Sequence, residues 1–232
     1  MSYGLKVVND DSYIQIDSDT PRLCAIHSGT YQAVDSRVAV VNFPTPITTI
    51  EPPCIFIQNS STQPDYVYDG AYLKGSSGNW TGFELSVANV TWRPTGKWFC
   101  AVFASQAQDD FGMRLWSAEG KVIFDSGTTP VVVTRATNVL DYRGYYNYET
   151  LGSVVWYSFN FGSSSPMLSD EYFMINPFSR DVPYRDAIVF NTGIKWDWGA
   201  NELRFYTFTN IPGAGWTDRG GPGAVFARLP GT

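Results

Sequence analysis

Histidine, cysteine and clustered basic residues are all scarce in this chain of 232 residues. His27 is the only histidine, so it is the only histidine that could act as the base for a catalytic serine or cysteine. No serine lies in a Gly-x-Ser-x-Gly elbow. A single histidine in an apolar stretch is more often a hydrogen-bonded structural residue. We therefore expect no catalytic residues and a protein that is not an enzyme.

The three cysteines, Cys24, Cys54 and Cys100, are odd in number, and their spacing matches neither a disulfide-rich framework nor a Cys-x-x-Cys metal site. Cys24 and His27 do have the spacing of half a zinc site. However, residues three apart on a strand point to opposite faces, and residues 23–26 look extended. We therefore expect the cysteines to be small apolar fillers, with no metal ion and no cofactor.

Positive charge is also in short supply, because 22 acidic residues face 16 basic ones and no Lys and Arg cluster exists. Phosphate groups and anionic lipids both require such a cluster, so nucleic acid is not an expected partner. Nowhere do 18 uncharged apolar residues run together, and residues 1–8 lack the basic and apolar regions of an export signal. The sequence predicts folding in a reducing cytoplasm without membrane insertion.

Paired carboxylates are the remaining route to an enzyme, since a hydrolase of sugars needs two acids across a cleft. Most acidic candidates lie at predicted turns, where Asp caps backbone amides and stays in water. A glycan depolymerase is therefore the third hypothesis, behind two that involve no catalysis. The candidates are Asp10, Asp11, Asp109, Asp110, Asp170, Glu171, Asp181, Asp186 and Asp197.

What the chain has in quantity is β-forming material, with 15 Phe, 14 Tyr and 8 Trp, while 21 Gly and 14 Pro mark turns. No segment of helical length has a clear apolar stripe, and the best helical candidate is the short segment 99–108. We therefore predict an all-β fold. The predicted strands are 37–43, 54–58, 66–73, 83–91, 98–104, 131–135, 154–161, 172–175, 187–190, 203–209 and 224–229.

A repeat divides the chain into two halves. Residues 3–20 align without a gap to residues 111–128, at an offset of 108 (111 minus 3). Aromatic residues match aromatic ones, cations match cations and apolar residues match apolar ones. We predict two tandem antiparallel β-sandwich domains, 1–108 and 109–232, related by internal duplication. The identical pairs are Gly4 and Gly112, Asp17 and Asp125, Ser18 and Ser126, and Thr20 and Thr128.

Each copy of the repeat predicts a β-hairpin. In the second copy Met113 and Leu115 share one face, residues 117–120 make the turn, and Val122 and Phe124 return on the same face. Gly120 supplies the left-handed residue of a bulged turn. The first copy has polar residues 9–12 there without a glycine, so its turn is expected to differ in detail. Looser matches, 56–59 with 173–176 and 92–103 with 198–209, fall in the same order.

Tyrosines are dense between residues 142 and 148, which read Tyr-Arg-Gly-Tyr-Tyr-Asn-Tyr. This run is too polar to be all core, and rigid amphipathic side chains suit a protein interface or a surface on which sugars stack. Trp216 stands in a Gly-rich stretch that we expect to be a loop before the last strand. The candidate interface or glycan-stacking residues are Tyr142, Tyr145, Tyr146, Tyr148 and Trp216.

The opening Tyr3-Gly4-Leu5-Lys6-Val7-Val8-Asn9, with Asp17-Ser18 downstream, resembles the start of a group of tail-associated virion structural proteins of long-tailed, siphovirus-like bacteriophages. Those proteins share a Tyr-Gly-Leu-x-Val-x-Asn strand, a short turn with Gly and an Asp-Ser ending. Here Ser12 stands in place of the turn glycine, which the second copy keeps as Gly120. The signature covers a small share of the chain and carries over no catalytic residue.

The resemblance implies a place in the virion tail, in the tail tip, baseplate or tail fibre, after assembly in the host cytoplasm. It also implies several copies, as in a symmetric homo-oligomer such as a trimer. The leading expectation is a non-enzymatic structural protein that docks on other phage tail or baseplate proteins. The alternative is a host-attachment module that recognises a bacterial surface receptor, either a glycan or a pilus.

Overall fold

The computed structural model is an antiparallel β-structure, as the composition predicts. The helix considered for residues 99–108 is not formed, because residues 99–103 belong to a strand, while residues 105–108 lie outside the described part of the chain. Within the described residues the only helical element is the 3₁₀ turn η1 (Asn176–Phe178). The structure describes residues 6–8, 14–17, 22–62, 66–104, 111–117, 120, 122–148, 152–162, 167–178, 182–184, 188–209 and 223–230.

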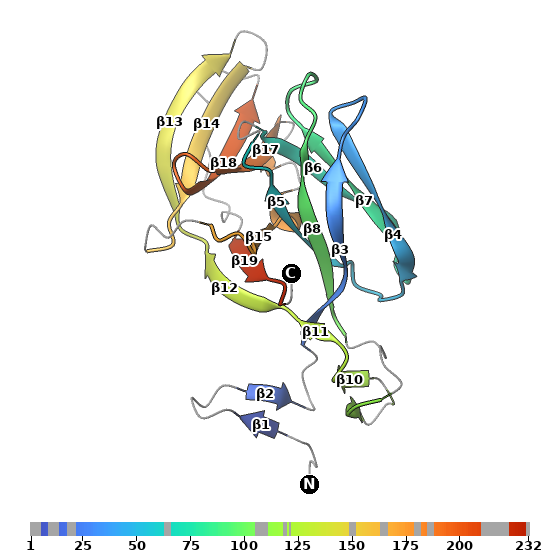
Figure 1. The fold of residues 1–232 in the computed structure, drawn as a ribbon. Helices are drawn as coiled ribbons and strands as arrows, with labels where there is room; N and C mark the ends of the chain where they lie inside the picture. The colour runs from blue at the N-terminus through green and yellow to red at the C-terminus, as the bar shows by residue number, and fades with distance from the viewer. Residues whose placement is uncertain are drawn as a thin grey trace.

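Two large antiparallel sheets make up the body of the molecule (Figure 1). The first, which we call the curled sheet, has the strand order β11-β3-β8-β5-β15-β19-β12. Its strands are β3 (Leu23–Gln32), β5 (Cys54–Asn59), β8 (Thr95–Phe103), β11 (Thr129–Pro130), β12 (Val132–Thr137), β15 (Glu171–Met174) and β19 (Ala224–Arg228).

The second sheet, which we call the open sheet, has the order β13-β14-β18-β17-β6-β7-β4, and a short strand β16 also pairs with β17. In Figure 1 the hairpin of β13 and β14 arches away at one side and β4 lies at the other. Its strands are β4 (Val38–Ile47), β6 (Tyr68–Ser76), β7 (Asn79–Val87), β13 (Leu140–Tyr148), β14 (Gly152–Phe159), β16 (Val182–Tyr184), β17 (Ile188–Asp197) and β18 (Glu202–Thr209).

The main hydrophobic core lies between the two sheets. On one side of it Trp98 of the curled sheet meets Phe83 of the open sheet edge to face, with ring centroids 5.2 Å apart. On the other side Phe226 of the curled sheet meets Trp196 of the open sheet in the same way at 5.5 Å. Burial of each such ring stabilises the fold by roughly 1.5–3 kcal/mol. These contacts hold the two sheets face to face as a sandwich.

The curled sheet closes on itself at one end. Only Val131 separates β11 from β12 in the chain, yet these two strands stand at opposite ends of the strand order. The first part of this continuous segment pairs with β3, and the Val131 N–H donates to the Leu23 carbonyl at 2.9 Å, whereas the later part pairs with β19. Six strands therefore form a ring, because one segment supplies both edges.

The inside of this ring is filled by a second, smaller core. Phe56 and Phe99 stack with their ring centroids 4.6 Å apart, and Tyr172 meets Phe99 edge to face at 5.0 Å. These residues come from β5, β8 and β15, and residues of β3 and β19 pack against them. Strand β5 is therefore covered on both faces, since its neighbouring Ile55 and Ile57 belong to the main core.

A buried ion pair ties three neighbouring strands of the ring together. Arg135 of β12 donates to both carboxylate oxygens of Glu171 of β15, at 3.2 and 2.7 Å, across the intervening β19. The Arg135 guanidinium also lies over the ring of Phe226, 4.4 Å from its centroid. Thr134 donates to the same carboxylate. The charge of Glu171 is thus fully paired although the residue is buried.

Removal of this charge is expected to destabilise the protein strongly. Glu171→Gln leaves the Arg135 guanidinium buried without its counter-charge, and breaking such a pair costs roughly 3–5 kcal/mol of unfolding free energy. The matched control is the neighbouring Asp170→Asn, because Asp170 pairs with Arg228 at 3.4 Å and its side chain is 40% exposed, against 4% for that of Glu171. We expect that control to change stability by less than about 1 kcal/mol. Denaturant unfolding of the two variants measures the difference, and equal losses would contradict it.

The two halves predicted from the repeat lie side by side and share both sheets. Strand β5 of the first half pairs with β15 of the second, and β6 pairs with β17. One main core contains residues from both halves. The boundary predicted at residue 108 therefore does not separate two cores, because the edge strands of the halves pair with each other. Residues 105–110 themselves lie outside the described part of the chain.

Within the shared sheets the halves repeat one strand order. The curled sheet runs β3-β8-β5 in the first half and β12-β19-β15 in the second, so that the two series meet at β5 and β15. The open sheet likewise runs β4-β7-β6 and β14-β18-β17, with β13 added outside β14. At the seam Phe56 pairs with Met174 and Ile57 with Phe173. In the sequence match Phe56 corresponds to Phe173 and Ile57 corresponds to Met174. Each residue therefore pairs with the counterpart of its neighbour, which is what a two-fold axis between the two segments would produce.

Local irregularities repeat as well. The pairing of β3 with β8 shifts register between Ala25 and His27, and the pairing of β12 with β19 shifts between Val133 and Arg135. These two positions are again 108 residues apart (133 minus 25). A β-bulge is a specific backbone feature rather than an accident of composition. The gapless alignment therefore extends structurally beyond the sequence match of residues 3–20 with 111–128.

The two predicted hairpins are present, and they have identical registers. Strands β1 (Lys6–Val8) and β2 (Ile14–Asp17) form one two-stranded sheet, and β9 (Arg114–Trp116) and β10 (Val122–Asp125) form the other. Lys6 pairs with Asp17 as Arg114 pairs with Asp125, and the register shifts at the same step. In Figure 1 both hairpins stand outside the two large sheets, at the end where β11 lies.

Hydrogen bonds in the second hairpin explain why four positions are identical between the copies. Ser126 Oγ accepts from the Met113 N–H at 3.0 Å, and Asp125 accepts from Arg114 Nε at 2.6 Å and from the Gly127 N–H at 2.9 Å. Thr128 Oγ1 donates to the Asp125 carbonyl at 2.7 Å. Gly112 has a φ of 135°, and a Cβ there would overlap Ser126 Oγ. The shared residues are those that close the hairpin.

Gly120 also has the predicted left-handed conformation, with a φ of 79°, and its N–H donates to the Ser117 carbonyl at 3.0 Å. The Gly-containing turn of the second hairpin is therefore confirmed. The corresponding turn of the first hairpin, residues 9–13, lies outside the described residues.

Gly112→Ala is expected to open the second hairpin while the sandwich stays folded. The added methyl group meets Ser126 Oγ in a backbone conformation that L-residues rarely adopt, and the hairpin belongs to neither large sheet. Amide hydrogen exchange of residues 113–126 should become at least tenfold faster, with unchanged exchange in β8. Gly78→Ala is the control, because Gly78 also has a positive φ, of 80°, but open space around it. Unchanged exchange in the hairpin would contradict this account.

Candidate functional site

The predicted tyrosines lie on β13, the outermost strand of the open sheet. Tyr142 is 63% exposed and Tyr145 is 42% exposed, which is far more than expected for core residues. Tyr142 pairs with Tyr157 of β14 and Tyr145 pairs with Val155, and the register shifts between Tyr142 and Gly144. Tyr157 and Val155 are two residues apart in β14 and therefore lie on one face of the sheet. Because of the shift, Tyr142 and Tyr145 lie opposite them and share that face, although they are three residues apart in β13.

That face continues into the main core. The rings of Tyr142 and Tyr157 meet edge to face with centroids 5.9 Å apart, and Tyr157 in turn contacts Phe205 of β18 at 6.5 Å. Tyr157 packs against the main core, whereas the two β13 tyrosines extend beyond it to solvent. The result is a solvent-facing aromatic surface, supported from below by buried rings.

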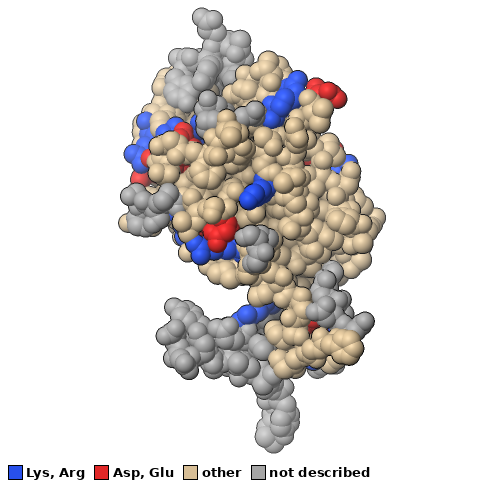
Figure 2. All heavy atoms as spheres, viewed as in Figure 1, with Lys and Arg blue, Asp and Glu red and all other residues tan. Residues whose placement is uncertain are grey.

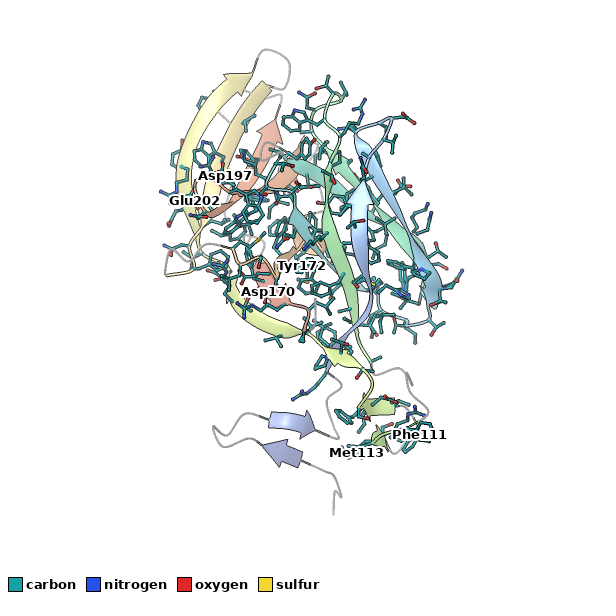
Figure 3. The ribbon with its side chains drawn as sticks, in the orientation of Figure 1. Phe111, Met113, Asp170, Tyr172, Asp197 and Glu202 are labelled. Carbon is teal, nitrogen blue, oxygen red and sulfur yellow. The ribbon has the colours of Figure 1, made fainter. Side chains whose placement is uncertain are left out.

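The opposite face of the same strands carries a charged network around Trp156. The Arg204 guanidinium lies 4.7 Å from the centroid of the Trp156 ring and binds Asp197 at 2.7 Å. Glu202 accepts from Arg204 at 3.2 Å and from Arg143 at 3.1 Å, so this β18 carboxylate links β18 to β13. Figure 3 shows Asp197 and Glu202 close together on this side of the molecule.

The electrostatics of this network favour charge balance. Partial burial by itself raises the pKa of Asp197, but the Ala200 N–H, Arg204 and Lys195 outweigh it, so that the pKa is lowered below its ordinary value. At a pH above the ordinary pKa of an aspartate, Asp197 is ionised and its interactions stabilise the fold. This stabilisation is lost as the pH falls through the lowered pKa. Since each acid here has a cationic partner, the network holds the sheet together rather than offering a free acid.

A second exposed surface lies on the hairpin of β9 and β10. Phe111 is 90% exposed and Trp116 is 57% exposed, and Met113 is also exposed. Figure 3 shows Phe111 and Met113 on this projecting hairpin, well away from the sandwich. A monomeric surface rarely gathers large apolar side chains on one projection unless something covers them. The equivalent positions of the first copy are Tyr3, Leu5 and Val8.

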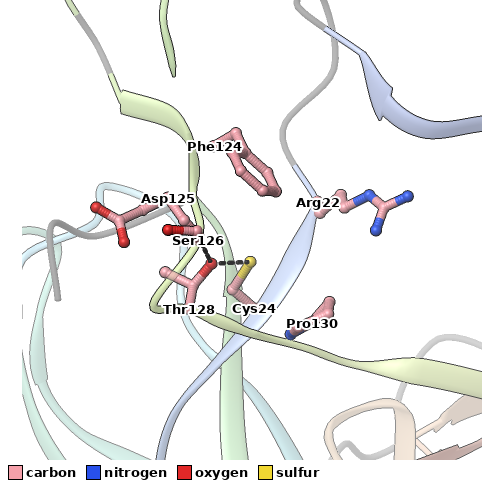
Figure 4. Close-up of a pocket in the computed structure, with 7 residues that line it drawn as sticks. All are labelled: Arg22, Cys24, Phe124, Asp125, Ser126, Thr128 and Pro130. Atoms are coloured by element: carbon pink, nitrogen blue, oxygen red, sulfur yellow. Dashed lines mark hydrogen bonds between the residues drawn. The ribbon is translucent and has the colours of Figure 1, made fainter. Parts of the chain in front are cut away.

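A cavity of about 190 Å³ lies where this hairpin joins the curled sheet (Figure 4). Arg22 and Cys24 line it from the start of β3, Phe124 and Asp125 line it from β10, and Pro130 from β11. Thr128 Oγ1 and Cys24 Sγ are 3.7 Å apart within it. The cavity is smaller than the ~300 Å³ at which pockets for small molecules begin. It is a small gap where the hairpin of β9 and β10 packs against the start of the curled sheet.

The remaining residues singled out in the sequence are placed as follows. Tyr146 and Tyr148 lie in β13, but their side chains are outside what the structure describes, and Trp216 lies outside the described residues altogether. Sequence reasoning did not select Trp116 or Arg204. The only signal for Trp116 was its place in a repeated hairpin, and Arg204 carried no sequence signal, because its partners come from other positions in the open sheet.

The cysteines and the histidine do not converge on one site. Cys100 points into the main core and Cys54 packs against the smaller core inside the ring, so they lie on opposite faces of the curled sheet. Burial raises the pKa of the Cys100 thiol to about 12, which keeps it protonated. His27 Nε2 lies 2.9 Å from the Thr45 carbonyl and serves a structural contact. Cys24 and Cys100 are buried fillers as predicted, while Cys54 is only partly buried.

The acidic candidates that the structure describes are held by cations. Glu171 pairs with Arg135, Asp170 with Arg228 and Asp197 with Arg204. Asp10, Asp11, Asp109, Asp110, Asp181 and Asp186 lie outside the described residues. Figure 2 shows that on the viewed face the charged side chains are few and that most acidic ones stand beside basic ones.

Among the described residues there is no group of three or more His, Cys, Asp or Glu side chains placed to hold a metal ion. The described part of the chain also contains no helix that is long and apolar enough to span a membrane. Comparison with known proteins identifies no relative, because no family model, no curated protein and no solved structure matches the chain.

Proposed function

We propose that this chain is a non-enzymatic structural component of a bacteriophage tail tip, baseplate or tail fibre, which docks on other tail proteins. The observation that carries the proposal is the signature hairpin, built twice with one register, standing outside the sheets and exposing Phe111, Met113 and Trp116. Two-stranded sheets are marginal in water by themselves. A ribbon of this kind gains stability when another protein covers it.

We further infer that the chain arose by duplication of one module of about 100 residues, a size typical of a single sandwich domain. The repeated strand order, the equal hairpin registers and the bulges 108 residues apart support this origin. Two docking hairpins per chain then follow from the duplication. In a virion, several copies would present these hairpins around the tail axis, which suits a symmetric homo-oligomer.

The proposal predicts that the chain is found in purified particles and that the second hairpin is required for its incorporation. Replacing Phe111 and Trp116 together by serine should reduce incorporation at least tenfold, because the contact surface is lost while the sandwich remains folded. The control is Val40→Ser, since Val40 is similarly exposed but lies on β4. Mass spectrometry of particles from complemented infections measures both variants. Particles that lack the chain, or full incorporation of the double variant, would overturn the proposal.

A second candidate function is attachment to a bacterial surface glycan or pilus through the aromatic surface of β13. Exposed rings supported by a buried layer, as in Tyr142 and Tyr145 above Tyr157 and Phe205, are the arrangement on which sugar rings stack. A depolymerase is less well supported, because the acidic candidates within the described residues, Asp170, Glu171 and Asp197, are paired with cations.

Titration of the protein with host cell-wall glycans separates the attachment function from docking alone. If glycans stack on β13, calorimetry should record saturable binding; this readout is chosen over intrinsic fluorescence because Trp156 of the adjacent strand points to the opposite face. Tyr142→Ala and Tyr145→Ala should then weaken binding at least tenfold, which is the loss typical of one stacking side chain. The exposed Tyr72→Ala, on β6, is the control. A flat titration would leave only protein partners.

A further inference from the structure

We propose that β13 joins two copies of this chain, by antiparallel pairing of β13 with β13 of a second copy about a two-fold axis at Tyr142. The inference deepens the proposed function and rests on its expectation of symmetric copies. It names the strand through which the copies associate and the symmetry of the contact. That symmetry gives a two-fold dimer, whereas the sequence analysis considered a trimer.

The first reason is that few strand edges are open. The curled sheet has closed into a ring, because β11 and β12 form one segment that pairs with β3 and with β19. The open sheet ends at β4 on one side and at β13 on the other. Within the described strands, β13 pairs with β14 alone and β4 with β7 alone. Both therefore have backbone N–H and C=O groups on one side that no described strand pairs with.

The second reason is that only one of these edges carries prolines. Strand β4 carries Pro44 and Pro46, both exposed, in the segment where its register with β7 is interrupted. Proline has no N–H to donate, and edge prolines are a common device against pairing with another chain. Strand β13 is nine residues long and contains no proline, so every residue keeps its N–H, although a bulge at Arg143 interrupts its register with β14. Its exposed Tyr142 and Tyr145 are residues enriched in protein interfaces.

The third reason is that the chain already joins its halves in this way. At the seam β5 and β15, which are matched in sequence, pair edge to edge and antiparallel, with Phe56 opposite Met174 and Ile57 opposite Phe173. In the open sheet β6 of the first half and β17 of the second also pair antiparallel, with Tyr68 opposite Ile194. Reciprocal pairing of like edges is therefore the mode of association that this fold uses internally. Pairing of β13 with β13 would repeat it between chains.

The fourth reason is charge complementarity about Tyr142. Asp141 and Arg143 flank this residue, so antiparallel pairing centred on Tyr142 places each Asp141 opposite Arg143 of the other copy. Opposite charges directly across a strand pair are favourable, and like charges are unfavourable. Arg143 has no partner in the register of β13 with β14, and its side chain reaches Glu202 on the outer face. The sequence around Tyr142 is thus complementary to itself.

Self-pairing of one edge also yields a closed assembly. A two-fold contact uses the same patch on both copies and is complete with two chains. The other end of the described strand order is β4, whose prolines disfavour the addition of a third copy there. This favours a second copy over an unrelated strand as the occupant, because an unrelated partner would require neither the self-complementary charges nor the asymmetry between the edges.

Disulfide trapping at the axis tests the proposal directly. In the Cys54→Ser background, Tyr142→Cys places a cysteine opposite its own copy, about 4.5–5.5 Å away between Cα atoms, which a disulfide can span. Mild oxidation should give a species of twice the 25.8 kDa monomer mass on non-reducing gels. Tyr145→Cys on the same strand would lie roughly 20 Å from its copy. This control, and Val40→Cys on β4, should stay monomeric on the gel.

A charge swap supplies the independent readout. Asp141→Arg or Arg143→Asp alone should weaken dimerisation, measured by light scattering, by roughly tenfold or more, because like charges then face each other. The double variant, which exchanges the two residues, should restore it. Thermal unfolding of each variant checks that the fold is retained, and Glu84→Lys on β7 controls for a charge change elsewhere on the open sheet.

The outcomes separate this inference from the proposed function. A cross-link at Tyr142 with rescue by the charge swap supports pairing through β13. A dimer without that cross-link keeps the expectation of symmetric copies but overturns the use of β13. A protein that stays monomeric at all concentrations, or binds glycans through Tyr142, also overturns it, whereas the presence of the chain in particles is decided by the incorporation experiment.

Discussion

The pairing of β5 with β15 is the contact on which the rest of the structure depends. The first half supplies three strands to the curled sheet, and the seam joins them to β15, β19 and the continuous segment of β11 and β12. The ring closes because the β11 part of that segment then reaches β3 of the first half. The same seam brings Phe173 and Ile57, both fully buried, opposite each other. Without it, two apolar edges would face water, and neither core would be complete.

Closure of the ring also decides where the hairpins stand. Strand β2 precedes β3, and β10 precedes β11, and β3 and β11 are neighbours in the curled sheet. Both hairpins therefore emerge at one end of the molecule, as Figure 1 shows. Strand β13 lies at the far edge of the other sheet. Docking through the hairpins and self-association through β13 would thus use separate surfaces and could occur together.

Much of the local structure was predictable, because turn residues bound the apolar runs and the repeat has no gap. Strand β13 was missed because the bulge at Gly144 interrupts its alternation, so that exposed Tyr142 and Tyr145 are three residues apart rather than two. Only residues 23–26 of β3 were read as extended, and the rest of the strand was missed because His27, Ser28 and Gly29 are held by pairing with β8 rather than by burial. The sharing of sheets between the halves was not predictable, since pairing of edge strands distant in the chain leaves no periodic signal. Only the continuous apolar run of β5 hinted at it, as that strand is covered on both faces.

The two candidate surfaces have one physical property in common. An all-β chain must deal with the unpaired edges of its strands, and this one does so by closing one sheet into a ring and placing Pro44 and Pro46 in β4. The exceptions are a two-stranded ribbon with Phe111 and Trp116 exposed, and the edge of β13 with Tyr142 exposed. If the two proposals hold, the edges that this fold leaves open are those that other chains would complete. On this view the tyrosine-rich segment and the repeated hairpin are two parts of one assembly function, and neither requires chemistry at a catalytic group.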